Sequence, residues 1–278
     1  MVLSFLVVLG CAEPDVVPPA EPASWAATAV EETVERVAGD CAGAEGCVRF
    51  VATFPRFAAD STGADSTDAA DSRRLMDLEI ARLLSKAPLS AGPSDEPAKN
   101  LGDQADRWIG AWRTALHEVP EAGPQRWLID KRVDVIHEAP MILSLRATEL
   151  RSTGGAHPNA WSAYVSFDRS QGRPWRLEHL LIDGFEAPLR ARFEARFRTE
   201  REMSPEQSFR SVGFTLEDDR LRLPEQWAIV EDGLLFFFNA YDIGPYALGP
   251  TEVRVEREAL SDLVAPDGPL AAWAAVED

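Results

Sequence analysis

Hydrophobic residues along the chain follow two different periods, which divide it into predicted strands and helices. Between residues 126 and 168, apolar and polar positions alternate in three consecutive stretches, RWLIDKRVDVIHEA, MILSLRATEL and AWSAYVSFD. Alternation with a period of two is typical of half-buried strands. We therefore expect an antiparallel meander, joined by the short HEAP turn and by RSTGGAHPN. VRFVATF at 48–54 predicts a further strand.

Other stretches carry apolar residues three and four positions apart, which predicts amphipathic helices. These lie at about residues 67–86, 101–118 and 184–200. In the last of them the apolar residues fall four apart on one face, at Phe185, Leu189, Phe193 and Phe197. Shorter helices are expected in SPEQSF, where Ser204 can cap and Pro205 can begin the first turn, and in REALSDLVA.

The C-terminal third predicts a hairpin, a loop and a strand. WAIVEDGLLFFFN is expected to be a hairpin that turns at Asp232-Gly233. LLFFFN is apolar on both faces, so we place it near a sheet centre. In TEVRVE, Val253 and Val255 are expected to point inward.

The loop between these strands, YDIGPYALGP, contains Tyr241 and Tyr246. Proline lacks the backbone N–H of a paired strand, so Pro245 and Pro250 require a segment that leaves the sheet and returns. Tyrosine rings can be buried there while their hydroxyls find partners. A structural corner is the favoured interpretation, and a ligand site is the alternative.

The elements together predict an α+β fold, a mostly antiparallel sheet with helices packed on one face, because strands come in runs rather than alternating singly with helices. We divide the folded part into an N-terminal subdomain at 31–124 and a C-terminal domain at 125–278. No internal repeat is visible.

The first eleven residues predict a lipoprotein signal. MVLSFLVVLG is almost wholly apolar and is followed by Cys11 in a lipobox-like Val8-Leu9-Gly10-Cys11. Ten residues span only about 15 Å as a helix, roughly half of a bilayer core. A basic region is missing from this signal, and an accidental apolar N-terminus of a cytosolic protein is the alternative.

Residues 12–30 contain AEPDVVPPAEPAS and are expected to form a proline-rich tether. A tether after a lipidated Cys11 would hold the folded body at the cell envelope. The predicted localisation is therefore exported and lipid-anchored, at the outer membrane or the periplasmic face if the cell is Gram-negative.

The remaining cysteines, Cys41 and Cys47, predict a disulfide, since an even pair in an exported protein is typical of one. A metal site is the alternative, but no histidine lies near them. We predict neither a metal nor a cofactor.

Charge limits the classes of partner. The chain has 28 Lys and Arg against 46 Asp and Glu, a formal net charge of −18. Nucleic acid binding requires clustered cations and is excluded. A basic protein partner is compatible with this charge, and so is simple solubility.

Candidate chemistry is sparse. None of the four histidines lies in an HExxH motif, and neither a GxSxG nor a phosphate-binding GxxxxGK motif is present. The most distinctive polar stretch is STGGAHPN, in which a rigid loop would present His157 and Asn159 to a ligand. A hairpin turn whose histidine bonds locally is the alternative. No catalytic residue is assigned.

At residues 125–265 the chain resembles a known family. The stretch EDGLLFFFNAYDIGPYALGPTEVRVEREAL, preceded by STGGAHPN and WRLEHLL, is similar to the extracytoplasmic domain shared by RsiV-type anti-sigma factors and PdaC-type peptidoglycan deacetylases. Here the loop is GPYALGP, with Gly244 where the family usually has alanine. The TFDDG motif of the deacetylase catalytic domain is absent, so that activity is not carried over.

The resemblance implies a sensor-type domain, because RsiV-type members bind lysozyme. The favoured function is a non-enzymatic cell-envelope lipoprotein that binds a protein or cell-wall ligand, with His157, Asn159, Tyr241 and Tyr246 as candidate ligand-binding residues. The alternatives are an enzyme that modifies peptidoglycan and a purely structural envelope module.

Overall fold

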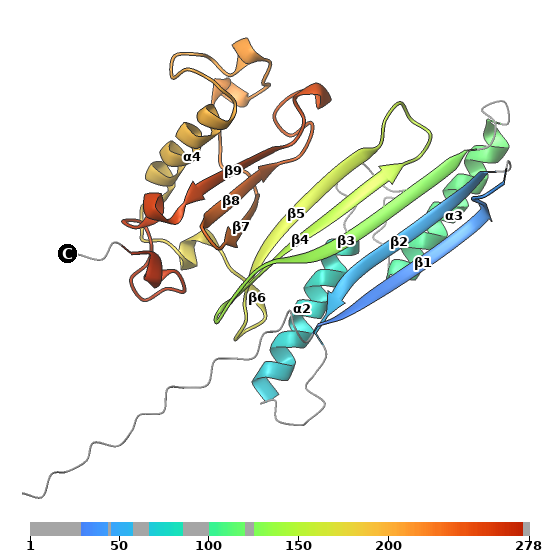
Figure 1. Ribbon diagram of the computed structural model, residues 1–278, viewed down its shortest axis with the longest axis horizontal. Coiled ribbons are helices and arrows are strands. Elements are labelled where there is room, and N and C mark those ends of the chain that lie inside the picture. Colours follow the sequence, from blue (N-terminus) through green and yellow to red (C-terminus); the bar gives the residue numbers. More distant parts are fainter. Residues whose placement is uncertain (1–28, 44–45, 58–66, 86–99, 120–124, 275–278) are drawn as a thin grey trace, which may run out of the picture.

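A computed structural model describes residues 29–43, 46–57, 67–85, 100–119 and 125–274 of the protein. These residues form two β-sheets and three α-helices (Figure 1). One sheet has the strand order β1-β2-β3-β4-β5-β6 and the other has the order β7-β8-β9. The predicted α+β class, dominated by antiparallel sheet, is confirmed. Instead of one sheet, however, the chain builds two.

The larger sheet is antiparallel except at one pair of strands. β2 and β3 run parallel because the chain crosses over between them through two helices. The next strands form the predicted meander, in which β3 pairs with β4 and β4 with β5. The strands of this sheet are β1 (Val30–Asp40), β2 (Gly46–Arg56), β3 (Arg126–Ala139), β4 (Ile142–Ser152), β5 (Asn159–Asp168) and β6 (Arg173–Pro174).

The sequence pattern did not predict β1. Its sequence, VEETVERVAGD, is rich in acids and none of its residues is buried, so it carries no clear alternation. The strand forms because it pairs with β2 along its whole length, from Val30 opposite Arg56 to Asp40 opposite Gly46. β1 begins at Val30, the last residue of the predicted tether.

Two helices cover one face of the larger sheet. α2 (Thr67–Ser85) buries Met76 and Ile80 against β3, β4 and β5, and α3 (Leu101–Glu118) buries Trp108 and Trp112 against β1, β2 and β3. Asn100 caps α3, since its Oδ1 accepts a hydrogen bond of 2.9 Å from the Asp103 N–H. Both helices end within one residue of the predicted bounds.

The smaller sheet contains β7 (Gln226–Val230), β8 (Gly233–Phe238) and β9 (Thr251–Glu256). β8 is the central strand, as its uninterrupted apolar sequence predicted. On one face, Phe236 packs under α4 (Glu186–Glu200), where its ring centroid lies 5.1 Å from that of Phe193. On the other face, Phe237 meets Tyr164 of β5. Val253 and Val255 on β9 are buried as expected.

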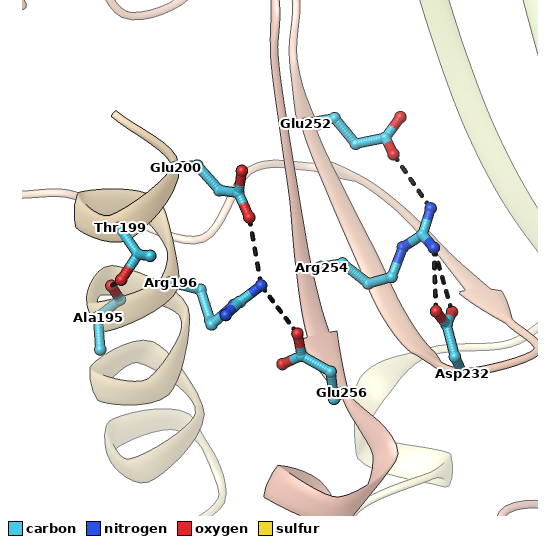
Figure 2. Close-up of polar contacts among 8 residues, drawn as sticks. All are labelled: Ala195, Arg196, Thr199, Glu200, Asp232, Glu252, Arg254 and Glu256. Carbon is cyan, nitrogen blue, oxygen red and sulfur yellow. Dashed lines mark hydrogen bonds and ion pairs between the residues drawn. The ribbon is translucent and has the colours of Figure 1, made fainter. Parts of the chain in front are cut away.

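Arginines on α4 and on the edge strand β9 form ion pairs around the smaller sheet (Figure 2). Arg196 on α4 lies 2.8 Å from Glu256 on β9 and 3.2 Å from Glu200 one turn further along α4. On β9, Arg254 contacts Asp232 in the β7–β8 turn. These pairs are exposed, so they orient α4 and the turn more than they stabilise them.

Two local predictions were wrong, and a third holds only in part. The β7–β8 turn is made by Glu231 and Asp232, because Gly233 already pairs with Val230. A side chain at Gly233 would meet the Val255 carbonyl at 2.1 Å, so this glycine serves a close backbone approach rather than a turn.

SPEQSF forms turns instead of a helix. The Arg198 guanidinium donates hydrogen bonds to the carbonyl oxygens of Ser204 and Gln207, at 3.1 and 2.9 Å, so these carbonyls bond outside any helix. REALSDLVA contains only a 3-10 turn, Arg257–Leu260. The chain beyond it is held by a bridge between Leu181 and Val264 and leaves the helical path.

The predicted disulfide is confirmed. Cys41 and Cys47 are bonded, with their Cα atoms 5.0 Å apart. The bond closes the turn between β1 and β2, at the end of that hairpin where Asp40 pairs with Gly46. Cys11 and the predicted lipobox lie outside the described residues.

Candidate functional site

The first part of the site is the loop between β4 and β5, which contains TGGAHP, the middle of the stretch STGGAHPN. Gly154 takes a φ of +86°, a conformation that favours glycine and lets the chain turn tightly. His157 is exposed, and its Nδ1 lies 3.0 Å from the Pro158 carbonyl oxygen. The local hydrogen bond expected of a hairpin turn is therefore present.

The second part is the loop between β8 and β9. It leaves the sheet after Phe238, makes a 3-10 turn at Tyr246–Leu248 and returns at Thr251. The loop thus runs outside the sheet, as its two prolines predicted. Tyr241 adopts a φ of +76°, which is uncommon for a residue with a side chain. Conformations of this kind concentrate at sites where function requires them.

The two loops meet through their aromatic rings. His157 stacks on Tyr246, with ring centroids 3.9 Å apart and an angle of 16° between the planes. The Tyr246 hydroxyl donates a hydrogen bond of 3.2 Å to the Pro158 carbonyl. The ring of Tyr241 follows at 5.5 Å from Tyr246. We call these three side chains, His157, Tyr241 and Tyr246, the aromatic platform.

The aromatic platform faces solvent. Tyr241 is 55% exposed and Tyr246 37% exposed, and both are among the large exposed apolar side chains of the described residues. The expectation that both rings would be buried was wrong, although the Tyr246 hydroxyl does find a partner, as expected. The corner and the ligand-site interpretations are therefore compatible, because Tyr246 fixes the loop while one side of each ring stays accessible.

Asn239 fixes the base of the second loop to the larger sheet. Its Oδ1 accepts from the Ser162 N–H at 2.7 Å, and its Nδ2 donates to the Ser162 carbonyl at 3.0 Å. Two residues along β5, Gln226 Oε1 accepts from the Tyr164 N–H at 3.1 Å. The side chains of Asn239 and Gln226 thus form hydrogen bonds with backbone groups of β5 to which a neighbouring strand would otherwise bond.

Asp242 completes this base. Its Oδ2 accepts a hydrogen bond of 2.7 Å from the Asn239 N–H. Asp242 keeps an exposed side, but its partial burial raises the pKa of its carboxyl, and the hydrogen bonds from Asn239 lower this pKa by less. A pocket of about 360 Å³ lies beside the carboxylate and is lined by residues that include Trp161, Glu225 and Asn239.

A second polar cluster lies under α2, away from the platform. Lys131 Nζ is 2.8 Å from Glu149 and donates at 2.7 Å to the Leu84 carbonyl at the end of α2. Burial lowers the pKa of Lys131, and Glu149 partly opposes this effect. Gln104 also donates to the Leu84 and Ser85 carbonyls. The cluster therefore terminates α2 and has a structural role.

Three of the four predicted ligand-binding residues come together, but Asn159 is not part of this contact. Asn159 is the first residue of β5, pairs with Arg151 on β4 and is half-buried. The residues that sequence reasoning missed are Ser162, Gln226 and Asp242, whose polar side chains lie in or beside strands without a motif. Asn239 was visible only as the point where the apolar run LLFFF stops.

In the part of the chain that the structure describes, no group of three or more His, Cys, Asp or Glu side chains is arranged to hold a metal ion. None of the described helices is both long enough and apolar enough to cross a membrane. Among the described residues, His157 has no hydrogen bond or ion pair with a carboxylate.

Comparison with known proteins finds a similarity in the part of the chain that contains the second loop. Residues 178–258 match the family described as protein of unknown function (DUF3298). The DUF3298 segment runs from before α4 to just past β9, so it includes Tyr241 and Tyr246 but not His157. No curated protein matches the chain.

Two solved structures of DUF3298 proteins share the fold. A DUF3298 member from Bacteroides fragilis is 17% identical, with a TM-score of 0.62 over 88% of this chain and 97% of its own. A DUF3298 protein from Pseudomonas aeruginosa PAO1 is 16% identical, with a TM-score of 0.59 over 87% of this chain and 97% of its own. The likeness thus extends well beyond the DUF3298 segment, to the larger sheet.

Proposed function

We propose that this protein is a non-enzymatic lipoprotein of the cell envelope, which binds a basic protein through its aromatic platform. The observation that carries the proposal is the stacking of His157 on Tyr246, which leaves Tyr246 and Tyr241 exposed. Exposed aromatic groups that are held rigidly are typical of binding surfaces, and tyrosine is enriched among residues that dominate binding energy.

Rigidity supports a binding role. The platform joins loops that are far apart in sequence. Asn239 anchors the second loop to β5, and the Tyr246 hydroxyl joins it to Pro158 in the first loop. A partner would therefore meet aromatic rings that are already ordered, so association costs less conformational entropy. Catalysis has less support, since His157 has no carboxylate contact among the described residues that would make it a general base.

Charge favours a basic protein as the partner. A net charge of −18 attracts a positively charged protein over a distance and repels an acidic one. The resemblance to the RsiV-type domain suggests lysozyme, which is basic, as the first partner to test. The Cys41–Cys47 disulfide supports an oxidising compartment outside the cytoplasm.

The test is binding of hen egg-white lysozyme to the immobilised full chain at salt concentrations from about 20 mM to about 300 mM. We expect binding that weakens with salt and that falls about tenfold or more in Tyr246→Ala. Leu78→Ala, at an exposed apolar residue on α2, is the matched control and should bind like the wild type. Absence of binding at low salt removes lysozyme as the partner.

Two further measurements separate the alternatives. Co-sedimentation with peptidoglycan that Tyr246→Ala abolishes would indicate a cell-wall ligand instead of a protein. Hydrolysis or deacetylation of peptidoglycan that His157→Ala abolishes would contradict the non-enzymatic proposal.

The lipid anchor is tested separately. The intact mass of the membrane-extracted protein should show cleavage before Cys11 and added acyl chains, and Cys11→Ser should release the protein from the membrane fraction. A membrane-extracted mass without acyl chains would contradict the lipoprotein part of the proposal.

A further inference from the structure

β1 is a long edge strand with one open side. It pairs with β2 along its whole length, and within the described residues no segment pairs with its other side (Figure 1). Proteins usually protect such edges with charged side chains, especially lysine, with proline, with bulges or with short strands, because unpaired backbone groups attract further strands. β1 carries charges, but four of its five charged residues are acids. β1 has neither proline nor lysine, its register with β2 shows no bulge, and Val30 and Val37 are 58% and 50% exposed.

The charged side chains of β1 differ in whether they have a partner of opposite charge within the described residues. Arg36 is its single cation, and its guanidinium donates at 2.9 Å to the neighbouring Glu35 carbonyl. Among the described residues, Arg36 has no carboxylate within ion-pair distance. Glu32 lies four residues earlier and therefore on the same face of the strand. It forms only an exposed pair of 3.3 Å with Arg56.

A second copy of the chain can satisfy this edge by symmetry. Suppose that two β1 strands pair antiparallel about a two-fold axis. Residues directly opposite each other then have side chains on the same face of the sheet, so they must be an even number of positions apart in sequence. The axis therefore passes through one residue, which lies opposite its own copy. Three registers leave at most two of the 11 residues of β1 unpaired, and they are centred on Val34, Glu35 or Arg36. Centring on Glu35 or on Arg36 places that charge against its own copy, which is destabilising.

The register centred on Val34 has no such conflict. It places Glu32 of each copy opposite Arg36 of the other, so that opposite charges meet twice. Val34 then faces its own copy, and Val30 lies opposite Ala38. Of these three registers, only the one centred on Val34 is self-complementary in charge.

We propose that β1 is a self-association edge, through which two copies of the chain form one continuous sheet with Val34 on the two-fold axis. Paired along residues 30–38, the two strands would exchange about eight to ten backbone hydrogen bonds, the number found in a typical protein interface. The net charge of −18 on each copy opposes association at long range, and salt at about 0.15 M screens this repulsion beyond about 8 Å.

The inference goes beyond the proposed function and does not depend on it. β1 and β5 are separated by three strands of the sheet, and the aromatic platform lies on loops that adjoin β5. Pairing of β1 strands would leave both platforms open, so the dimer would be bivalent. Bivalency raises the apparent affinity for a multivalent partner without any new contact.

Charge reversal tests the register directly. In sedimentation of the full chain in mild detergent at about 0.15 M salt, we expect a dimer. In an Arg36→Glu dimer, glutamates at positions 32 and 36 would face each other across the interface, and in a Glu32→Arg dimer, arginines would do so. The dimerisation affinity of each variant alone should therefore be lower by about tenfold or more. An equimolar mixture of these two variants should dimerise again, because every opposed pair then carries opposite charges. Recovery in the mixture also shows that neither variant failed to fold.

Cross-linking gives a second readout. In a Cys11→Ser background, Val34→Cys should form a disulfide-linked dimer under mild oxidation, since opposed Cα atoms of paired strands lie about 4.5–5.5 Å apart. Thr33→Cys is the control, because its two copies would lie more than about 7 Å apart. A monomeric wild type, a dimer that Arg36→Glu leaves unchanged, no recovery in the mixture, or equal cross-linking of both cysteine variants would each overturn the proposal.

Discussion

The side chain of Asn239 pairs with the backbone of Ser162 as a neighbouring strand would. Its oxygen accepts from the Ser162 N–H at 2.7 Å and its nitrogen donates to the Ser162 carbonyl at 3.0 Å, across 77 residues of sequence. An asparagine side chain carries the same donor and acceptor as a peptide group. One buried residue thus holds the loop of Tyr241 and Tyr246 against the strand that follows His157.

Replacing Asn239 with alanine should destabilise the protein by about 2–4 kcal/mol, because two hydrogen bonds are lost and buried backbone groups of β5 lose their partner. Urea unfolding measures this difference. Asn159→Ala, at the half-buried asparagine that begins β5, is the matched control and should change the free energy of unfolding by less than about 0.5 kcal/mol. Equal effects of the two substitutions would show that Asn239 is not the anchor of the loop.

Asp242 makes the stability of this corner depend on pH. Burial raises its pKa above the ordinary value of 3.8, so between the unfolded and folded pKa values the folded chain binds more protons than the unfolded chain. Stability therefore falls as the pH rises through this window, and the loss remains above the folded pKa. Asp242→Asn removes this titration and keeps an oxygen that can accept from the Asn239 N–H.

We expect the free energy of unfolding of Asp242→Asn, relative to wild type, to increase between about pH 3 and about pH 6 and then to level off. Urea unfolding of both proteins across this range gives the difference, in which the titration of all other groups cancels. A difference that stays constant or decreases with pH would contradict the raised pKa.

Tyr241 is held at a positive φ, which costs a residue with a side chain about 1–2 kcal/mol. Asparagine tolerates this conformation better. Tyr241→Asn should therefore leave the thermal midpoint of unfolding unchanged or raise it slightly, although it removes the ring that lies beside Tyr246 in the aromatic platform. Binding of the basic partner should nevertheless fall.

This separation of stability from binding distinguishes a functional tyrosine from a structural one. Thermal unfolding and the lysozyme binding assay, applied to the same preparation, measure the two effects. A variant that unfolds at a clearly lower temperature would show that Tyr241 serves the corner itself.

Two residues on α4 should differ sharply in their contribution to stability. Phe193 is fully buried, with ring contacts to Phe236 and Phe238, so Phe193→Ala should cost about 3–5 kcal/mol. Arg196, one turn further on, makes two exposed ion pairs, so Arg196→Ala should cost less than about 1 kcal/mol. Urea unfolding of the two variants measures both changes in the free energy of unfolding. Comparable changes would mean that the ion pairs of Figure 2 contribute as much to the packing of α4 on the smaller sheet as the buried ring does.

The sequence by itself determined the elements whose pattern is local. α3 runs from Leu101 to Glu118, as its apolar spacing indicated, and β3 matches the alternation of residues 126–139. Burial on one face imposes a period on the sequence, and this period can be read without knowing what covers the face. The Cys41–Cys47 bond was predictable for a similar reason, because it joins residues six positions apart.

Only the tertiary structure decided what depends on contacts between distant segments. β1 forms because β2 lies beside it, and β7 and β8 form a second sheet that packs against β5 instead of extending the first. The stacking of His157 on Tyr246 and the pairing of Asn239 with Ser162 bring together residues more than seventy positions apart. Such contacts produce no periodic pattern in the sequence, because each depends on two residues that become neighbours only when the chain has folded.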